Sequence, residues 1–483
     1  MEDRKQNPAT SDPKAAFAKE EANFDRGIYD IKDEVDYSAS AGDMGLSEEI
    51  VRDISAHKNE ASWLLERRLE GLHLFEQAHN PLWGTDISPV QMEKIVTYIK
   101  PQAKATADWK ELPDYILNTF DRLGIPEAEY KQELSGVGAQ YDSEIVYHRL
   151  TKEMEDKGVI YCDFDVGAAQ YPELVKKYFG KCIPPTAHRY AALHYALWSG
   201  GSLVYVPKGV QVDVPLQSYY RLNAPGAGQF EHTLIILEEG SYCHFIEGCS
   251  APKYNALNLH AGAVELFVGE GATLRYSTIE NWSKNMYNLN TKRAIVEKNG
   301  TIEWVSGSFG SRVSNLYPMS ILKGEYARSD YTGISFAGHD QVIDTGMKVI
   351  HAAPHTSSNI NSKSICKGGG VANYRSEVRV LPKAIGSKSS ADCQSLMLDN
   401  LSRSDTIPVI DVQTDQVDLG HEAKIGRISD AQIFYLTSRG IDEKEARAMI
   451  VRGFAEPVAK ELPLEYASEM NNLISLELEG GLA

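Results

Sequence analysis

Hydrophobic and polar positions change their period twice along the chain. In EASWLLERRLEGLHLFEQ, residues 60–77, apolar side chains recur every three or four positions, which is typical of an amphipathic helix. Ser47 precedes the neighbouring segment and is predicted to be its N-cap. The same spacing predicts helices in residues 46–59, 89–100, 112–125, 126–134, 171–180 and 187–200. We therefore expect a helical domain over residues 46–200.

After Gly200 the pattern becomes short alternating runs, each divided by a charged residue and a glycine. The predicted turn glycines are Gly209, Gly240, Gly271, Gly300 and Gly324, about 30 residues apart. A strand, a tight turn and a strand that repeat at this period indicate stacked units, as in a β-solenoid. A β-sandwich is the competing interpretation, because its turns also recur, but less regularly. Strand-like runs continue as far as residue 427.

Helical spacing returns near the end of the chain. Residues 430–440, 441–454 and 463–478 are predicted to form helices, and Asp442 is expected to cap the second of them. The predicted organisation is a poorly ordered acidic segment (1–45), a helical domain (46–200), a β core (201–427) and a second helical domain (428–483). Helices on both sides of a solenoid would cover its open β edges.

Composition narrows the possible partners. The formal net charge is -18, which argues against binding to nucleic acid or to an anionic membrane. No run of about eighteen apolar residues is present, and the first residues lack the apolar core of a signal peptide. We therefore expect a cytoplasmic protein without a membrane span.

Motifs for common enzyme chemistries are missing from the sequence. The six cysteines form no CxxC pair, and there is no GxxxxGK[ST] phosphate loop. Two functional classes remain open at this point. A β-solenoid can be a carbohydrate-active enzyme with carboxylates along a groove, or a scaffold without catalytic activity of its own.

Seven segments bear on this choice. VYVPKGV, GQFEHTLIILEEGSY, EGCSAP, YSTIENW, TKRA, ADCQSLML and HEAKIG occur in this order. Together they resemble the SufB family, the scaffold subunits of the SUF machinery for iron-sulfur cluster assembly. The resemblance implies a right-handed parallel β-helix between two helical domains, in agreement with the periodicity. It favours the scaffold, with the carbohydrate-active enzyme as the alternative.

The resemblance also implies a route for sulfur. Cys249, in EGCSAP, matches the cysteine that accepts sulfur as a persulfide, a reaction that requires a reachable thiolate. Arg221, Asn223, Trp282 and Lys292 match positions along a sulfur path through the β-helix. From the residue alone, Trp282 is equally well interpreted as a core aromatic. Where family members often have glutamine, this chain has Glu280, which adds negative charge to the path.

A second set of residues is implied for the cluster itself. Cys393 matches the cysteine on which a nascent cluster forms, and His421 and Glu422 match nearby ligands. Without the resemblance, Cys393 would be interpreted as a small buried hydrophobe. A transferable cluster is expected to have few thiolate ligands, because harder ligands bind soft iron-sulfur centres less tightly. Other ligands would come from a second subunit.

The family further implies cofactors and partners. The cluster is expected to be transient and of the 4Fe-4S type, and a reduced flavin in the complex is one source of electrons. Expected partners are a SufC-like ATPase on the C-terminal helices, a SufD-like paralogue or a second copy of the chain, and a cysteine desulfurase system as sulfur donor. The N-terminal CxxCxxxC motif of many relatives is absent, since no cysteine precedes Cys162.

Overall fold

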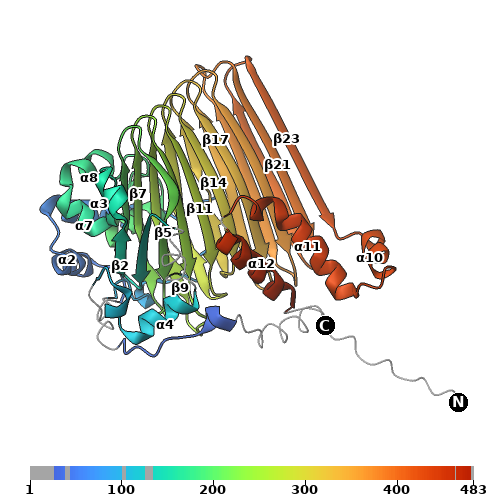
Figure 1. Ribbon diagram of the computed structural model, residues 1–483, viewed down its shortest axis with the longest axis horizontal. Helices are drawn as coiled ribbons and strands as arrows, with labels where there is room; N and C mark the ends of the chain where they lie inside the picture. The colour runs from blue at the N-terminus through green and yellow to red at the C-terminus, as the bar shows by residue number, and fades with distance from the viewer. Residues whose placement is uncertain are drawn as a thin grey trace.

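The computed structural model describes residues 27–37, 44–99, 105–123, 125, 134–462 and 464–479. The protein is mainly β, with a parallel β-solenoid of about eight turns between N-terminal and C-terminal helices (Figure 1). This confirms the predicted fold class and excludes the β-sandwich. Most of the segment expected to be poorly ordered, residues 1–45, lies outside the described residues, as does the helix predicted for residues 126–134.

Two sheets form the walls of the solenoid. In the described part of the chain the first sheet has ten strands, in the spatial order β2 (Glu144–Leu150), β1 (Gly136–Tyr141), β5 (Gln211–Arg221), β8 (Tyr242–Ser250), β11 (Thr273–Asn281), β14 (Thr301–Phe309), β17 (Arg328–Ala337), β19 (Ser357–Cys366), β21 (Ser387–Met397) and β23 (Val417–Arg427). From β1 to β23 all neighbours in this sheet are parallel.

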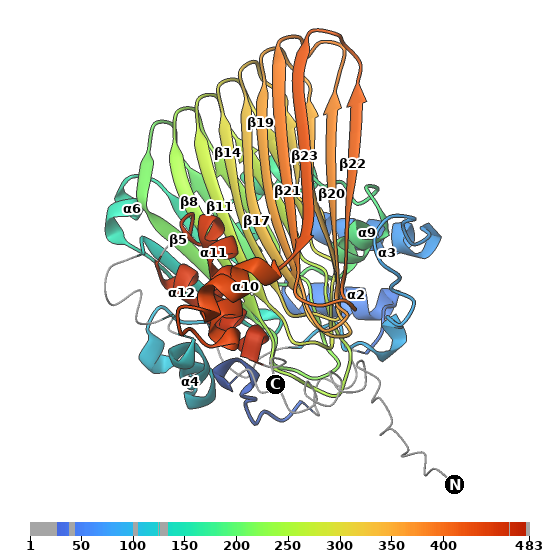
Figure 2. The ribbon, with the colours of Figure 1, turned by 90° about the vertical axis from the view of Figure 1, so that its right-hand side faces the viewer.

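The second sheet faces the first. Its main path, again over the described residues, runs β3 (Ile160–Asp163), β4 (Gly201–Val206), β7 (His232–Leu237), β10 (Ala263–Val268), β13 (Thr291–Val296), β16 (Met319–Leu322), β18 (Val342–His351), β15 (Val313–Leu316), β12 (Met286–Asn288), β9 (Asn258–His260) and β6 (Gly228–Gln229). Two later strands, β20 (Val371–Val380) and β22 (Arg403–Val412), continue it from β18. Figure 2 shows the strands of the two sheets side by side, with β23 and β22 as the last strands at the open end of the solenoid.

Stacking in register explains the periodicity of the sequence. Tyr242 pairs with Thr273, Thr273 with Thr301, and Thr301 with Arg328, so each turn of about 30 residues adds one strand to each ladder. Inward-facing apolar residues of successive turns form one continuous core. Fully burying each aliphatic or aromatic side chain contributes about 1.5–3 kcal/mol.

The predicted turn glycines differ in their roles. Gly209, Gly240 and Gly271 have positive φ, as expected for tight turns. Gly300 and Gly324, although they also lie at predicted turns, do not have positive φ. At these two turns there is too little space for a side chain, because a Cβ on either glycine would meet main-chain atoms of the preceding turn or its own.

The N-terminal part contains more than helices. Its helical elements are η1 (Gly27–Asp30), α2 (Glu48–His57), α3 (Ser62–Gln77), η3 (Met92–Lys94), η4 (Trp109–Glu111), α4 (Asp114–Arg122), α6 (Lys152–Asp156), α7 (Phe164–Gln170), α8 (Pro172–Tyr178) and α9 (Arg189–Leu197). Ser47 caps α2, as predicted, by accepting a hydrogen bond from the Ile50 N–H. Strands β1, β2 and β3 were not predicted; they extend both sheets at this end of the solenoid.

The helix predicted for residues 89–100 is wrong. Only Met92–Lys94 is helical, as one 3-10 turn, and the chain is then extended. Val96 donates to the Gly226 carbonyl and its own carbonyl accepts from the Gly228 N–H, while Ile95 and Ile99 are buried. These tertiary contacts outweigh the weak helical preference of the segment.

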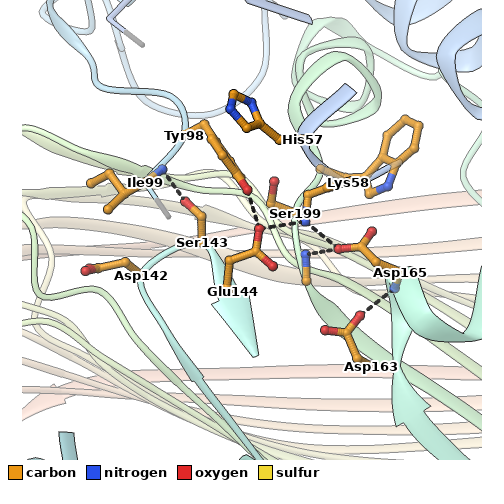
Figure 3. A network of polar contacts seen from close by, with 12 residues as sticks. His57, Lys58, Tyr98, Ile99, Asp142, Ser143, Glu144, Asp163, Asp165 and Ser199 are labelled. Atoms are coloured by element: carbon orange, nitrogen blue, oxygen red, sulfur yellow. Dashed lines mark hydrogen bonds and ion pairs between the residues drawn. The ribbon is translucent and has the colours of Figure 1, made fainter. Parts of the chain in front are cut away.

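A buried ion network joins α2 to the start of the solenoid (Figure 3). The Lys58 ammonium, at the end of α2, lies 2.6 Å from an Asp165 oxygen and 3.0 Å from a Glu144 oxygen. Tyr98 donates to the same Glu144 oxygen, and Asp165 accepts from the Gly200 N–H. Burial opposes the charge on Lys58, but the two carboxylates raise its pKa overall. The network fixes four N-terminal segments, at Lys58, Tyr98, Glu144 and Asp165, relative to the start of β4.

The C-terminal helices are α10 (Asp430–Thr437), α11 (Glu443–Ala459) and α12 (Leu464–Glu479). Helices α11 and α12 lie against the first sheet, and α10 lies beyond the end of β23 (Figure 1). Asp442 caps α11 as predicted, accepting from the Lys444 N–H. Apolar residues of α11 and α12, including Val451 and Met470, pack on outward-facing residues of the strands such as Ile279 and Ile334. Among the described residues, no helix is long and apolar enough to cross a bilayer.

Candidate functional site

Cys249 lies near the end of β8 and faces the interior between the two sheets. Its register neighbours are Tyr220 on β5 and Glu280 on β11. The Tyr220 hydroxyl contacts Ser202 and Thr233, which places this row of side chains inside the solenoid. Trp282 belongs to the same apolar cluster as Cys249, so two of the residues predicted for the sulfur path lie together.

The thiol of Cys249 is inaccessible in this conformation. Cys249 is 1% exposed, although a reachable thiolate was expected from the sequence. Burial raises the pKa of the Cys249 thiol well above its ordinary value, and the nearby carboxylates of Glu247, Glu231 and Glu280 raise it further. The resting form is therefore the neutral thiol.

Lys292 is the cation of this interior site. Its ammonium lies 3.3 Å from an oxygen of Glu247, 3.3 Å from an oxygen of Glu280 and 3.2 Å from the Thr278 hydroxyl. We call Lys292, Glu247, Glu280 and Thr278 the Lys292 cluster. The side chains of Lys292 and both glutamates have no exposed surface. The Lys292 ammonium lowers the pKa of the Cys249 thiol, but burial and the surrounding carboxylates outweigh this effect.

A hydrogen-bonded chain extends the Lys292 cluster. Asn288 donates to Glu280 at 2.7 Å and its carbonyl oxygen lies 2.8 Å from Nδ1 of His260, whose Nε2 lies 2.5 Å from Glu231. Burial opposes the charged form of His260, but the Glu231 carboxylate raises its pKa overall. The indole of Trp282 packs on the His260 ring, with 4.6 Å between the ring centroids. This series of hydrogen bonds thus connects the Lys292 cluster to the His260–Glu231 pair.

Arg221 and Asn223 face away from this interior site. Arg221 donates to the carbonyl oxygens of Tyr29 and Ile31 and to the Ser250 hydroxyl. Asn223 donates to the Asp33 carbonyl and the Tyr37 hydroxyl. Because neighbouring residues of a strand point to opposite faces, Tyr220 is inside and Arg221 outside. Arg221 and Asn223 therefore hold the segment 29–37 against the end of β5.

Cys393 lies on β21, one strand from the open end of the solenoid. Its Sγ is 3.9 Å from Nε2 of His421 on β23, and Cys393 is 1% exposed. Burial and the Asp392 carboxylate raise the pKa of the Cys393 thiol to about 12. The structure thus brings together two of the three residues predicted for the cluster site.

The side chain of Glu422 points away from Cys393. It follows His421 on β23, pairs in register with Asp392 and forms an exposed ion pair with Lys424 at 2.9 Å. In the part of the chain that the structure describes, no group of three or more histidine, cysteine or acidic side chains is arranged to hold a metal ion. The Cys393–His421 pair is therefore a partial ligand set.

Four interior residues of the site were not predicted from the sequence: Glu231, Glu247, His260 and Asn288. For Glu247 a signal existed. It lies two positions before Cys249 on the same strand, so the period of two places both on one face. For His260 and Asn288 no local pattern exists, because they come from strands of the second sheet.

The open end of the solenoid presents unpaired strands. Among the described strands, β23 pairs only with β21 and β22 only with β20. Apolar side chains are exposed on these two strands: Val409, Ile410, Val412 and Ile425. Unpaired strand edges with exposed apolar residues are typical of surfaces that pair with another chain.

The fold and the site together define a class of protein: a β-solenoid flanked by helices, with buried single cysteines and a partial ligand set at its open end. Family comparisons identify the family. Residues 220–454 match the SufBD core domain of the SUF system for FeS cluster assembly, and residues 140–218 match the SufBD protein N-terminal region.

Relatives of known family match nearly the whole chain. An iron-sulfur cluster assembly SufBD family protein of Staphylococcus aureus is 51% identical over 447 residues, which cover 92% of this chain and 96% of the relative. One of Staphylococcus haemolyticus is 50% identical over 454 residues, covering 94% and 97%. The chain belongs to the SufBD family of iron-sulfur cluster assembly proteins. The alternative of a carbohydrate-active enzyme has no support.

Proposed function

We propose that this chain is a SufB-type scaffold, rather than a SufD-type one, which accepts sulfur at Cys249 and assembles a nascent cluster at Cys393. The observation that carries the proposal is the Cys393–His421 pair beside the unpaired ends of both sheets. A cysteine and a histidine at such an edge leave room for ligands from a second subunit. The motifs EGCSAP and ADCQSLML supply the SufB-type resemblance.

The sulfur step requires no net oxidation or reduction. The Cys249 sulfur attacks the terminal sulfur of a donor persulfide, the donor S–S bond breaks, and a new S–S bond forms on Cys249. The Cys249 proton leaves with the donor thiol: Cys249–SH + R–S–S⁻ gives Cys249–S–S⁻ + R–SH. Because the thiol is buried, this step follows an opening of the structure around the end of β8. A cysteine desulfurase system supplies the donor.

The sulfur then passes along the interior, past Trp282 and Lys292, to Cys393: Cys249–S–S⁻ + Cys393–SH gives Cys249–SH + Cys393–S–S⁻. The Lys292 ammonium stabilises the persulfide anion. Arg221 and Asn223 contribute by holding the segment 29–37 over the end of β5. Arg221 also donates to the hydroxyl of Ser250, the residue that follows Cys249.

The nascent cluster is the cargo of this scaffold. Cys393 supplies the thiolate and His421 an imidazole, while Glu422 joins the ligand set after a local rearrangement of β23. A second subunit, either a SufD-like paralogue or another copy of this chain, pairs with β22 and β23 and completes the set. A transient 4Fe-4S cluster with few thiolates is suited to transfer.

Other components come from partners. A SufC-like ATPase docks on the C-terminal helices, where Phe434, Tyr435 and Met449 are exposed. A reduced flavin in the complex supplies electrons.

The test is anaerobic reconstitution of the complex with its ATPase partner, iron and sulfide. Cys393→Ser should lose most of the cluster absorbance. Cys366→Ser, a control in the neighbouring strand β19, should keep it. Equal absorbance of wild type and Cys393→Ser would disprove the assignment.

Cys249→Ser separates the two steps of the proposal. This variant should assemble a cluster from free sulfide but lose sulfur uptake from the desulfurase. Unchanged uptake would show that Cys249 is not the acceptor, without affecting the assignment of Cys393.

A further inference from the structure

A cavity lies on the outer face of the second sheet, apart from the interior site. Its volume is about 420 Å³, within the range of pockets that bind small molecules. Trp83 and the start of α9 form one side of the cavity, and strands β13, β16, β18, β20 and β22 form the other. Figure 2 shows α9 on the side of the second sheet, away from α11 and α12. Neither Cys249 nor Cys393 lines the cavity, so the proposed function leaves it without a role.

The floor of the cavity is one row of outward-facing side chains. Lys292 points into the solenoid, so its neighbour Arg293 on the same strand points outward. In register with Arg293, one side chain from each following strand continues the row: Met319 on β16, Lys348 on β18, Glu377 on β20 and Val409 on β22. The stacking of turns therefore brings residues that are far apart in the sequence onto one surface.

Arg293 is a cation without an ion-pair partner among the described residues. It donates a long hydrogen bond, 3.5 Å, to the Cys182 carbonyl. Lys348, by contrast, lies 2.7 Å from an oxygen of Glu377. Burial lowers the pKa of Arg293, and the neighbouring acidic groups oppose this effect only in part. The guanidinium of Arg293 is therefore suited to pair with an anion that enters the cavity.

Other charged groups near the cavity already have partners. Glu265, on the adjacent strand β10, accepts hydrogen bonds from main-chain N–H groups of residues 180–183. Arg375 lies 2.8 Å from an oxygen of Asp344. Burial lowers the pKa of His188 to about 3, so its ring is neutral near neutral pH. Among the described residues, the lining of the cavity therefore carries one positive charge that is not paired.

Asn290 supplies a polar group without a partner. It lies between β12 and β13, at a corner of the solenoid, where it lines the cavity and is 2% exposed. In the described part of the chain, neither the nitrogen nor the oxygen of its amide has a hydrogen-bond partner. Buried polar groups in folded proteins nearly always have one, so Asn290 is suited to bond a molecule that enters the cavity.

Trp83 forms an aromatic wall of the cavity. Its ring lies nearly perpendicular to the rings of Tyr317, His188 and Tyr190, with centroid distances of 5.2, 5.4 and 5.8 Å. These contacts fix the indole, yet Trp83 is 38% exposed, so part of its surface is available to a ligand. A fixed and partly exposed indole is suited to pack against a planar aromatic ring.

We propose that this cavity binds a small molecule that carries a planar aromatic ring and one carboxylate. The ring packs on Trp83, the carboxylate pairs with Arg293, and the amide of Asn290 donates to the ligand. A carboxylate matches the fork of N–H donors of arginine, and its single charge matches the one unpaired cation. A phosphate dianion would bring a second, uncompensated charge close to Glu377. The site is independent of the proposed cysteine chemistry.

The experiment titrates the full chain with 2-naphthoate and measures binding by isothermal titration calorimetry. A ligand of this size should bind with a Kd of about 0.1–1 mM. Two comparison compounds separate the charge from the ring: 2-naphthamide, which is neutral, and cyclohexanecarboxylate, which is not aromatic.

Each comparison compound should bind to the wild-type protein about tenfold more weakly than 2-naphthoate, because it lacks either the charge for Arg293 or the ring for Trp83. An absence of 2-naphthoate binding, or equal binding of 2-naphthoate and 2-naphthamide, would overturn the inference.

Variants of the lining residues test whether the compounds bind in this cavity. Arg293→Gln should remove the preference for 2-naphthoate over 2-naphthamide. Trp83→Leu should weaken the binding of both compounds about tenfold, and it serves if Arg293→Gln folds poorly, since Trp83 is partly exposed. Arg328→Gln, on the first sheet with an exposed ion pair to Asp330, is the matched control and should bind like wild type. Unchanged binding in both Arg293→Gln and Trp83→Leu would overturn the inference.

Discussion

Buried ionisable side chains in this protein fall into two kinds. Lys58 and Lys292 each lie between carboxylates, so their charges are compensated. Glu469, on α12, is half-buried against the first sheet and has a hydrogen bond from Asn281, but no cation among the described residues forms an ion pair with it. Burial raises its pKa to about 7.

The position of Glu469 predicts how α12 responds to pH. Because the folded pKa is raised above the ordinary value of 4.5, the stabilising contribution is fully present below about pH 4.5. It is lost as pH rises through about 7, at a cost of about 3 kcal/mol. Glu469→Gln should remove this dependence, as measured by hydrogen exchange of α12 between these pH values. Glu456→Gln, at an exposed site on α11, is the control; equal profiles for wild type and Glu469→Gln would refute the prediction.

At the level of elements, the turn between β14 and β15 fixes the backbone of Trp282. Gly310, in this turn, has φ +76, and a Cβ there would overlap the carbonyl oxygen of Trp282. The N–H of Trp282 is bonded to the Phe309 carbonyl, so the two segments cannot separate freely. This close approach requires glycine because any side chain would occupy the same space as the neighbouring turn.

Gly310→Ala should therefore destabilise the solenoid by about 2–4 kcal/mol, from positive φ and overlap together. Chemical denaturation monitors the stability, and tryptophan fluorescence monitors the surroundings of Trp282. Gly271→Ala is the matched control, since Gly271 also has positive φ but a Cβ added there would meet nothing within 4 Å. Its cost should be about 1 kcal/mol. Equal costs at the two sites would contradict the packing argument.

For the whole molecule, stacking predicts a gradient of stability. Inner strands such as β8 and β11 pair with a strand on each side and are covered by helices, whereas β22 and β23 each pair with one strand only among the described strands. In repeat architectures, stability comes largely from contacts between neighbouring turns.

Amide hydrogen exchange should accordingly be fastest in β22 and β23 and slowest in β8 to β14. Mass spectrometry of peptides from these strands measures the difference, and addition of the second subunit should slow exchange in the two edge strands specifically. Uniform exchange along the solenoid, or protection of the N-terminal turns on complex formation, would argue against pairing at this end.

The solenoid, the flanking helices and the caps Ser47 and Asp442 could all be predicted from the amino-acid sequence. These features depend on the spacing of apolar residues along the chain and on hydrogen bonds between residues a few positions apart. Both can be recognised in a linear sequence. The short motifs also pointed to Cys249, Lys292 and Cys393. The extended segment after Lys94 and the need for Gly300 and Gly324 could not be predicted from the local sequence, because contacts with distant backbone atoms decide both.

Which site residues contact one another could not be predicted from the sequence, because it depends on the folded chain. Cys249 and Glu280 come from adjacent turns of the first sheet, whereas Lys292 and His260 come from the opposite sheet. Arg221 faces outward, although the family resemblance assigns it to the same sulfur path. His421 reaches Cys393 while its neighbour Glu422 does not, since alternate residues of a strand face opposite sides. Register between turns about 30 residues apart sets these contacts, and a local pattern carries no information on that register.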